Sequence, residues 1–268
     1  MGNESVKSTY LLDLGGKTSL ITGGTSGIGY AIAEKFCIHN CRTIITGRNA
    51  DKGRNAEKNI NTLLKKETCS FLQCDAGVAA DAKKTCEGVI SEYGKIDILV
   101  LNAAMEITES INEIKIANWQ KIIDVNVNGV FYFIRFLIDS MLENKKGNII
   151  IIGSVVSYTG AGGGMHYATS KAALKGISAR INYELLLKGI RANIISPGVI
   201  DTPMLRKKYP DTREVNKKII SGIPAGRIGL PDDVANLALF LASDMSEYIC
   251  GQDILIDGGR LFYRRPSN

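Results

Sequence analysis

The chain has 268 residues, 45% of them hydrophobic and 22% charged, with a formal net charge of +6 at pH 7. This composition is typical of a globular protein with ample core, and the mild, evenly spread charge gives no support for nucleic-acid binding. No apolar run approaches the roughly 18 residues of a membrane span, and the polar start of the chain has no secretory h-region. We therefore expect neither a nucleic acid nor a membrane as a partner.

The six cysteines form no Cys-x-x-Cys pair, and only two histidines are present, His39 and His166. No metal site is expected from this set. Most of the cysteines fall inside apolar segments, which indicates buried thiols in a reducing compartment and predicts a cytoplasmic location.

The first predicted strand, residues 18–22, runs into a glycine-rich turn that opens a helix, where Ile28, Ile32 and Phe36 recur at helical spacing. Such a turn lets a phosphate approach the backbone at the helix N-terminus, where free N–H groups and the helix dipole favour an anion. A plain β-α turn is the alternative, but it does not need three glycines at this spacing. The predicted nucleotide-binding residues are Gly23, Thr25, Ser26, Gly27, Ile28 and Gly29.

The second strand, residues 42–46, closes a β-α-β unit and is followed by Arg48, with no acid before Asp51. An acid at this place would bind a ribose 2′-hydroxyl, whereas an arginine suits a 2′-phosphate. Arg48 therefore predicts NADP(H) rather than NAD(H) as cofactor. A solvated arginine at a strand end is the alternative.

Strands and helices alternate along the rest of the chain. Further strands are predicted over 69–74, 96–101, 148–152, 191–195 and 253–257, and helices over 51–67, 80–93, 119–141, 167–188 and 232–243. This alternation predicts an α/β fold with a doubly wound, seven-stranded parallel sheet in one domain over 1–268. Residues 1–13 form an N-terminal extension, residues 199–231 a substrate loop or lid with weak periodicity, and residues 260–268 a basic, poorly packed tail.

The stretch 153–171 carries the candidate chemistry. Ser154 follows a predicted strand at its carboxyl end, where open α/β sheets bind ligands. Tyr167 and Lys171 are four residues apart and therefore lie on one face of a helix. An ammonium beside a phenol favours the phenolate, so we expect the pKa of Tyr167 to fall from about 10 towards neutrality. Taken alone, the pair could be a surface tyrosine and a solvated lysine.

Several motifs in one order resemble the short-chain dehydrogenase/reductase family in its single-domain branch, over about residues 14–259. The glycine turn is similar to the cofactor loop of this family, which implies a Rossmann fold. Asp75 resembles the acid that contacts the adenine. The resemblance implies further cofactor contacts from Asn102, Ala103, Ala104, Pro197, Gly198, Ile200 and Thr202, with Tyr167 and Lys171.

Asn126, Ser154, Tyr167 and Lys171 match the catalytic tetrad of that family in order and spacing. The resemblance implies that Tyr167 is the general acid or base, that Lys171 lowers its pKa and anchors the nicotinamide ribose, and that Ser154 stabilises the substrate oxygen. It implies that Asn126 holds a water that relays protons through Lys171. A polar residue satisfied within a helix kink is the alternative for Asn126.

Two positions depart from the family pattern. Met105 stands in place of a glycine where the backbone approaches the cofactor, so it is expected to narrow the site unless a local shift absorbs it. Ser26 stands where NADP-preferring members often carry a second basic residue, so the NADP(H) prediction depends on Arg48 alone.

The lid over 199–231 is expected to contribute Met204, Leu205 and Tyr209 to the substrate pocket, with ordinary packing within the lid as the alternative. Ser154 is also expected to contact the substrate. His166 abuts Tyr167, but the proton chemistry already has its residues, so we interpret it as a wall of the pocket.

The predicted activity is hydride transfer between NADP(H) and a small-molecule ketone or secondary alcohol. Residues 152–156 and 223–233 resemble those of 3-oxoacyl carrier-protein reductases, which dock an acidic acyl carrier protein through basic residues at helix ends. Lys145 and Lys188 fall at matching places, although the helix dipole favours lysines there in any case. Members of the family are commonly homotetramers.

Other functions remain open. Hydroxysteroid and sugar-alcohol dehydrogenases share these motifs. A non-catalytic NADP(H)-binding sensor is a rival from another class, but it would have no need of a matched acid and stabiliser. Dehydration or epimerisation through a transient ketone is a third possibility.

Overall fold

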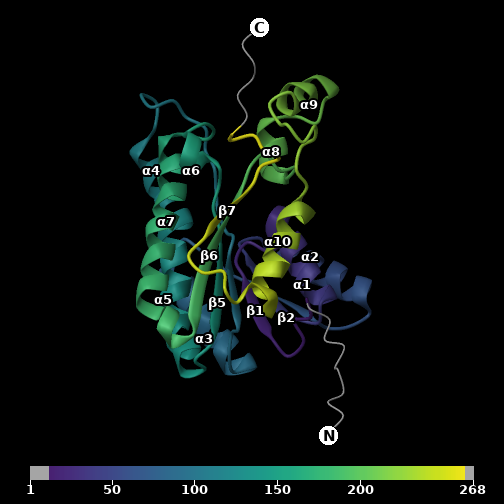
Figure 1. The fold of residues 1–268 in the computed structure, drawn as a ribbon, viewed down its shortest axis with the longest axis vertical. Helices are drawn as coiled ribbons and strands as arrows, with labels where there is room; N and C mark the ends of the chain where they lie inside the picture. The colour runs from purple at the N-terminus through teal and green to yellow at the C-terminus, as the bar shows by residue number, and fades with distance from the viewer. Residues whose placement is uncertain (1–11, 263–268) are drawn as a thin grey trace, which may run out of the picture.

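The computed structural model describes residues 12–262, which form a parallel sheet covered by helices on both faces (Figure 1). The seven strands lie in the order β3-β2-β1-β4-β5-β6-β7, and every neighbouring pair is parallel. The strands are β1 (Thr18–Ile21), β2 (Arg42–Gly47), β3 (Cys69–Gln73), β4 (Ile98–Leu101), β5 (Gly147–Ile152), β6 (Ile190–Pro197) and β7 (Asp253–Ile256). The predicted doubly wound α/β fold is confirmed.

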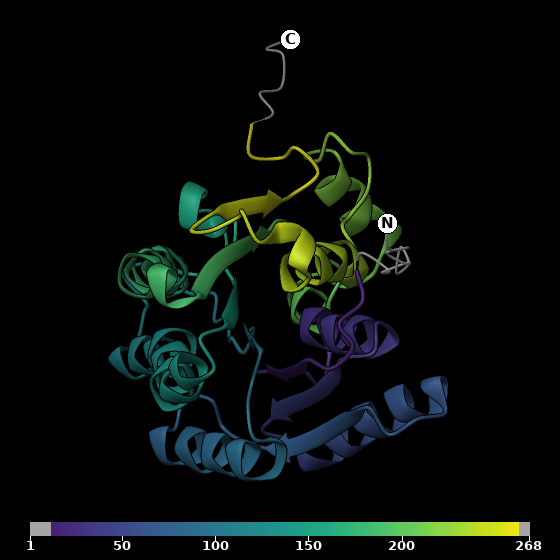
Figure 2. The same cartoon turned by 60° about the horizontal axis from the view of Figure 1, so that its bottom comes forward.

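Two sets of helices cover the two faces of the sheet, as Figure 2 shows from below. One face packs against α1 (Gly27–Ile38), α2 (Ala50–Leu64) and α10 (Pro231–Ala242). The other packs against α3 (Ala79–Tyr93), α5 (Gly129–Glu143) and α7 (Met165–Leu185). The shorter helices are α4 (Ile116–Ile123), α6 (Val156–Thr159), α8 (Pro203–Lys208) and α9 (Arg213–Ile220), with single 3₁₀ turns at Leu186–Lys188 and Asp244–Ser246.

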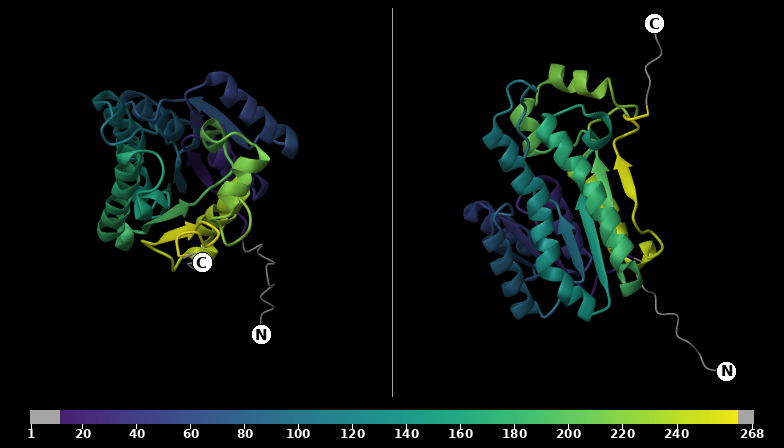
Figure 3. Two further views of the ribbon diagram at one scale, coloured as in Figure 1. Left: turned by 90° about the horizontal axis from the view of Figure 1, so that it is seen from above. Right: turned by 90° about the vertical axis from the view of Figure 1, so that its left-hand side faces the viewer.

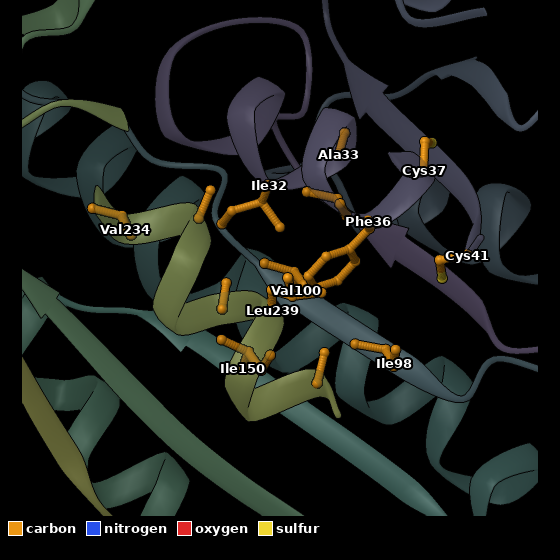
Figure 4. Close-up of a cluster of buried hydrophobic side chains, with 14 of the residues drawn as sticks. Ile32, Ala33, Phe36, Cys37, Cys41, Ile98, Val100, Ile150, Val234 and Leu239 are labelled. Atoms are coloured by element: carbon orange, nitrogen blue, oxygen red, sulfur yellow. The ribbon is translucent and has the colours of Figure 1, made fainter. Parts of the chain in front are cut away.

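Strand β4 is continuously apolar, and β5 is apolar over residues 149–152, because both faces of these strands are buried. Along β5, Ile149 and Ile151 point into the core under α3, α5 and α7. Ile150 and Ile152 point into the core under α1 and α10. Figure 4 shows the core under α1 and α10, in which the fully buried ring of Phe36 lies beside strand and helix side chains. Alternate residues of one strand therefore hold the two helical layers on the sheet.

The chain reverses its direction of winding between β1 and β4. From β1 the sheet grows through β2 to β3 on one side, and from β4 to β7 on the other. Neighbouring loops at the carboxyl ends of β1 and β4 therefore leave towards opposite faces and open a crevice between them. The glycine turn after β1 lies in this crevice.

The helix predicted over 119–141 is not one regular helix. It begins at Ile116, and a π-helical turn over Asp124–Asn128 separates α4 from α5. The N–H of Gly129 bonds to the carbonyl of Asp124, five residues back. π-helical turns are uncommon and are found mostly at functional sites.

The predicted lid, residues 199–231, contains two short helices, α8 and α9, where the sequence indicated only weak periodicity. Its two ends are paired, because Asp201 N–H bonds to the carbonyl of Gly229 and Gly229 N–H to that of Val199. The segment is thus a closed loop, and Figure 3 shows its helices standing beyond the carboxyl ends of the strands.

The predicted terminal segments are only partly described. Residues 1–11 of the N-terminal extension and residues 263–268 of the tail lie outside the described residues. Of the first residues of this tail, Arg260 and Leu261 line the main pocket, whereas Phe262 is 81% exposed, and the prediction of a poorly packed tail stays a prediction. The N–H of Leu261 bonds to the carboxylate of Asp257, which holds this segment beside the end of β7.

Between residues 12 and 262, no helix combines the length and the apolar character that crossing a bilayer requires. Over the same range no three or more His, Cys, Asp or Glu side chains gather as metal ligands would. Five of the six cysteines are buried free thiols, as predicted, and Cys250 is partly exposed.

Candidate active site

A cavity of about 630 Å³ opens at the carboxyl ends of the strands and extends from the turn after β1 to the lid helix α8. Its volume lies in the range of small-molecule and cofactor sites. It brings together nearly every residue that the sequence predicted for the site. These are Gly23, Thr25, Ser26, Gly27, Ile28, Arg48, Asp75, Asn102, Ala103, Ala104, Ser154, Tyr167, Lys171, Pro197, Gly198, Ile200, Thr202, Met204, Leu205 and Tyr209.

The glycine turn is held in shape by Asn102 and Thr22. Gly23 has φ +67°, in the left-handed region that glycine adopts without strain. The Asn102 side-chain amide donates to the carbonyls of Thr22 and Gly23, both at 3.0 Å. The Thr22 hydroxyl accepts the N–H groups of Asn102 and Ala103, also at 3.0 Å. The ends of β1 and β4 are thereby locked together at the crevice.

Gly29 has a different role from the one predicted, because it does not line the cavity. A Cβ atom on Gly29 would lie 2.4 Å from the Asn102 Nδ2 atom and 2.4 Å from the carbonyl oxygen of Gly23. The glycine is therefore needed for close packing of helix α1 against the brace of the turn, rather than for access of a phosphate to the backbone.

The adenosine end of the predicted cofactor site is polar and open. The Arg48 side chain is exposed, lines the cavity and has no hydrogen-bond or ion-pair partner within residues 12–262. The carboxylate of Asp75 accepts the N–H of Gly77 at 3.0 Å, which fixes its orientation at the end of β3. An unpaired guanidinium at this place can form bidentate bonds with a phosphate.

Ser154, Tyr167 and Lys171 converge on one wall of the cavity, from the end of β5 and the first two turns of α7. All three are buried. The Ser154 hydroxyl accepts the N–H of Val156 at 3.1 Å. The Lys171 ammonium donates to the carbonyl oxygen of Ile152 at 2.9 Å, and its Nζ atom lies 5.9 Å from the centre of the Tyr167 ring. The predicted shared face of the helix is present.

The predicted lowering of the phenol pKa by Lys171 is wrong for this structure. Burial is the main cause that raises the pKa of Tyr167 well above its ordinary value of 10.0, the negative charge of Glu106 adds to the rise, and a hydrogen bond with Ser154 opposes it. Burial also lowers the pKa of Lys171 from 10.5 to about 8. Loss of water is thus the largest cause of both pKa shifts.

Asn126 is fully buried in the π-helical turn and does not line the cavity. Its amide donates to the carbonyl of Met105 at 3.0 Å and to the Ser170 hydroxyl at 3.0 Å, and its oxygen accepts the N–H of Met105 at 2.8 Å. Ser170 in turn donates to the carbonyl of Tyr167. The side chain therefore ties the loop after β4 to the catalytic helix, which favours the alternative of a satisfied polar residue; the water relay stays a prediction.

Met105 does not narrow the cavity, contrary to the expectation for a residue in place of glycine. Its φ is not positive, so the backbone there needs no glycine, and its side chain is not part of the cavity wall. Ala104 and Glu106, its two neighbours, line the cavity instead. The backbone N–H and carbonyl of Met105 both bond to the side-chain amide of Asn126.

Glu106 and Lys208 are site residues that the sequence analysis missed. Both line the cavity and are mostly buried, and the Lys208 ammonium donates to Glu106 at 3.2 Å. They are 102 residues apart in the chain, so no local pattern joins them. A carboxylate two residues beyond the Asn102-Ala103-Ala104 motif was the only available signal.

The lid residues predicted to contact substrate, Met204, Leu205 and Tyr209, do line the cavity. Helix α8 is set by the Thr202 hydroxyl, which accepts the N–H of Leu205 at its amino end. Thr202 also lies against the glycine turn, since a Cβ atom on Gly27 would be 3.4 Å from its methyl group. Helix α8 therefore contacts the glycine turn at its amino end, through Thr202, and Glu106 at its carboxyl end, through Lys208.

The interpretation of His166 as a pocket wall is wrong. Its side chain is fully buried and is not part of the cavity wall. It faces the carboxylate of Glu109, which lies in the loop after β4.

The cavity fits a nicotinamide dinucleotide. At one end the glycine turn and the unpaired Arg48 suit phosphates, and at the other Ser154 and Tyr167 face the space where a carbonyl could react. Lys171 and Pro197 also line the cavity. A dinucleotide fold with a paired proton donor and oxygen binder defines the chain as an oxidoreductase of the Rossmann class.

A family model described as Enoyl-(Acyl carrier protein) reductase matches residues 23–260. The chain is 38% identical over 251 residues to 3-oxoacyl-[acyl-carrier-protein] reductase FabG of Rickettsia conorii, covering 94% of this chain and 99% of that protein. It is 37% identical over 251 residues to the protein of the same name from Thermotoga maritima, covering 92% and 98%. The RhlG/NADP active-site complex of Pseudomonas aeruginosa superposes with a TM-score of 0.87 at 28% identity, covering 93% of this chain and 98% of that chain. The chain belongs to the short-chain dehydrogenase/reductase family.

Proposed function

We propose that the protein is an NADP(H)-dependent oxidoreductase that interconverts a ketone and a secondary alcohol, with 3-oxoacyl thioesters as the leading substrate class. The observation that carries the proposal is the meeting of Ser154, Tyr167 and Lys171 on one wall of a cavity whose other end holds the glycine turn and Arg48. The relatives named as 3-oxoacyl reductases, matched over nearly their full length, support the substrate class.

The cofactor would supply or accept a hydride at its nicotinamide C4 atom. Tyr167 would give its proton to the carbonyl oxygen in reduction, and Ser154 would donate a hydrogen bond to the same oxygen as charge develops on it. Lys171, held by the carbonyl of Ile152, would bind the ribose hydroxyls next to the nicotinamide. Because the pKa of Tyr167 is raised, the phenol keeps its proton at neutral pH, which suits a proton donor in reduction.

The preference for NADP(H) rests on Arg48. Its guanidinium lies at the cavity wall after β2 and is free of other charged groups in the described part of the chain. A 2′-phosphate would give this cation the partner it lacks. The solved RhlG complex, which contains NADP by its name, is consistent with this choice.

A second candidate substrate class is a sugar or other polyol ketone. Glu106 and Lys208 place a carboxylate and an ammonium in the wall of the cavity. Charged groups at this place can bond to substrate hydroxyls, whereas a bare acyl chain would leave them without a new partner. A steroid ketone finds less support from these charged side chains.

The test is NADPH oxidation against a panel of carbonyls, with Tyr167→Phe measured beside the wild type. The panel contains a 3-oxoacyl thioester, an enoyl thioester, a steroid ketone and a sugar ketone. We expect turnover of the 3-oxoacyl thioester, reduced by about 10² to 10⁴ in the variant, with NADPH affinity unchanged. Turnover of the enoyl thioester alone would instead assign reduction of a carbon–carbon double bond, as the family model's description names.

A non-catalytic sensor predicts NADPH binding without turnover of any member of the panel. The burial of Ser154 and Tyr167 at the same wall argues against a sensor. Cofactor binding without turnover does not require a proton donor that is shielded from water. NADPH consumed in equal amount to the product would argue against dehydration or epimerisation through a transient ketone.

An acyl carrier protein is a proposed partner, but Lys145 and Lys188 give it little support. Lys145 precedes β5 and Lys188 precedes β6, at the amino ends of the strands, whereas the cavity lies at the carboxyl ends. The six residues of β5 separate the two edges by roughly 20 Å. A carrier docked at these lysines would not face the cavity of the same subunit. Comparing kcat/KM for a carrier-linked and a simple thioester, with both lysines changed to alanine, tests the docking.

We infer that the protein forms a homotetramer. Large apolar side chains are exposed on the helices that cover one face of the sheet, with Phe131 on α5 55% exposed and Tyr183 on α7 83% exposed. Leu187, just after α7, is fully exposed. Large apolar side chains exposed on the same helical layer are typical of interaction surfaces. A monomer in light scattering would overturn the inference.

A further inference from the structure

His166 is a fully buried imidazole that none of the roles above uses. It is the second residue of α7, directly before Tyr167. Its Nδ1 atom accepts the backbone N–H of Tyr167 at 2.9 Å. Because Nδ1 is an acceptor, the neutral ring carries its proton on Nε2.

The Nε2 atom of His166 lies 3.3 Å from Oε2 of Glu109. Both atoms are buried, and within residues 12–262 neither forms a hydrogen bond, so the two groups lie at ion-pair distance without a hydrogen bond between them. The other carboxylate oxygen of Glu109 accepts the side-chain amide of Asn118 at 2.7 Å. A continuous row of polar contacts therefore runs from Asn118 of α4 through Glu109 and His166 to the backbone of Tyr167.

His166 provides a hydrogen-bond acceptor for the amino end of α7, which has no capping side chain from the preceding residue. The first N–H groups of a helix have no partner within the helix. The residue before α7 is Gly164, which has no side chain to accept them. The imidazole of His166 accepts the N–H of Tyr167, the third residue of the helix, where a capping side chain usually acts. The side chain that caps this end of α7 thus belongs to the residue next to the proposed proton donor, and it bonds to the backbone of that donor.

Gly164 allows the row to close tightly. A Cβ atom at this position would lie 2.7 Å from Cε1 of His166 and 2.8 Å from the carbonyl oxygen of Glu109. Only a residue without a side chain leaves room for both. The histidine and the glutamate are therefore packed against the backbone that leads into Tyr167, so a shift of either one moves the start of the helix.

Glu109 also belongs to the loop after β4 that carries Glu106, whose charge acts on the phenol. Anchoring this loop to His166 fixes the distance between Glu106 and Tyr167. We propose that His166 and Glu109 are positioning residues that hold the Tyr167 phenol in its reactive place. The proposal rests on the proposed function, in which Tyr167 is the proton donor.

Three variants test the proposal. His166→Phe keeps the ring volume but removes both nitrogen atoms. His166→Gln keeps one acceptor and one donor on a side chain of similar reach. Glu109→Gln keeps the bond with Asn118 but removes the negative charge facing His166. Thermal unfolding and NADPH affinity are measured for each, and Tyr167→Phe gives the background rate.

We expect His166→Phe to lower kcat by about tenfold to a hundredfold while KM and NADPH affinity stay within about twofold, because misplacement of a catalytic group costs rate rather than cofactor binding. His166→Gln should keep most of the wild-type kcat, and the kcat of Glu109→Gln should lie between those of His166→Phe and His166→Gln. Wild-type kcat in His166→Phe, or equal losses in His166→Phe and His166→Gln that follow a fall in Tm, would overturn the proposal. If His166→Phe does not fold, wild-type kcat in Glu109→Gln would overturn it.

A second readout separates this proposal from the proposed function. The ultraviolet titration of Tyr167 is obtained by subtracting the signal of Tyr167→Phe. In the wild type Tyr167 should not ionise up to about pH 11, because burial keeps it neutral. In His166→Phe the loosened helix end should admit water and bring the titration below this pH. A shifted titration without carbonyl turnover in the wild type would reject the proposed function alone, whereas an unchanged titration would reject the positioning role.

Discussion

The ammonium of Lys208 and the carboxylate of Glu106 lie 3.2 Å apart and join helix α8 to the loop after β4, two walls of the same cavity. The same carboxylate raises the pKa of the Tyr167 phenol. The lid and the proton donor are therefore linked through one shared negative charge.

Glu106→Gln should shift the pH dependence of alcohol oxidation to lower pH. Oxidation needs the phenolate, and the negative charge of Glu106 opposes its formation. Removing that charge lowers the phenol pKa, so the rate at a fixed pH below this pKa should rise. The check is kcat for oxidation between about pH 7 and 10, where each unit of pKa is worth about tenfold.

Lys208→Met is the matched control for this effect. It leaves the carboxylate in place without its cation, so the oxidation profile should stay where it is or move to higher pH. A shift of both variants in the same downward direction would show that loosening of the lid, and not the charge of Glu106, controls the phenol.

Arg48→Ala should weaken NADPH binding by about tenfold to a hundredfold and leave NADH binding within about twofold, because only NADPH carries a 2′-phosphate. Fluorescence titration with each cofactor measures this. Arg54→Ala is the control, since Arg54 is exposed, pairs with Asp51 and does not line the cavity. Equal losses for the two cofactors would remove Arg48 from the site.

Gly29→Ala should destabilise the fold by about 1 to 3 kcal/mol and weaken cofactor binding, because the new methyl group would collide with the Asn102 amide and the Gly23 carbonyl. Gly176→Ala in α7 is the comparison. A Cβ atom there meets nothing within 4 Å, so alanine should be neutral or stabilise the helix by up to about 1 kcal/mol. Urea unfolding of the two variants measures the difference, and similar midpoints would contradict the packing role of Gly29.

Lys171→Met should change how stability depends on pH. Burial lowers the pKa of Lys171 from 10.5 to about 8, so between these values the unfolded chain binds more protons than the folded one. The free energy of unfolding contributed by this group therefore rises as pH increases from 8 towards 10.5, by at most about 1.4 kcal/mol per pH unit. The variant should lack this rise. Parallel stability profiles for wild type and variant, from denaturant unfolding at several pH values, would contradict it.

The sequence was enough to predict the sheet and most of the cavity wall. Strand β4 and residues 149–152 of β5 are apolar runs that are followed by Asn102 and Ser154, so the topology alone brings those residues to one crevice. The π-helical turn that holds Asn126 could not be predicted, because its extra residue leaves the apolar spacing on either side unchanged.

Contacts between distant segments were also outside the reach of the sequence. Glu106 meets Lys208 only because the lid folds back over the loop after β4, and no spacing rule connects them. The pKa of Tyr167 was misjudged for a related reason. The neighbouring lysine is visible in the sequence, whereas the burial that dominates the pKa arises only when the whole wall has formed.

The reversal of winding between β1 and β4 separates the residue proposed to select the coenzyme from the residues proposed to act on the substrate. Arg48 follows β2, on the side of the sheet that grows from β1, whereas Ser154 and Tyr167 follow β5, on the side that grows from β4. Mutations that alter the preferred coenzyme and mutations that alter the preferred substrate therefore fall in separate stretches of the gene. Coenzyme preference can therefore change while substrate preference is kept, and the reverse also holds. Exchanging the gene segments on either side of the β3–β4 connection between two relatives would combine the coenzyme preference of one with the substrate preference of the other.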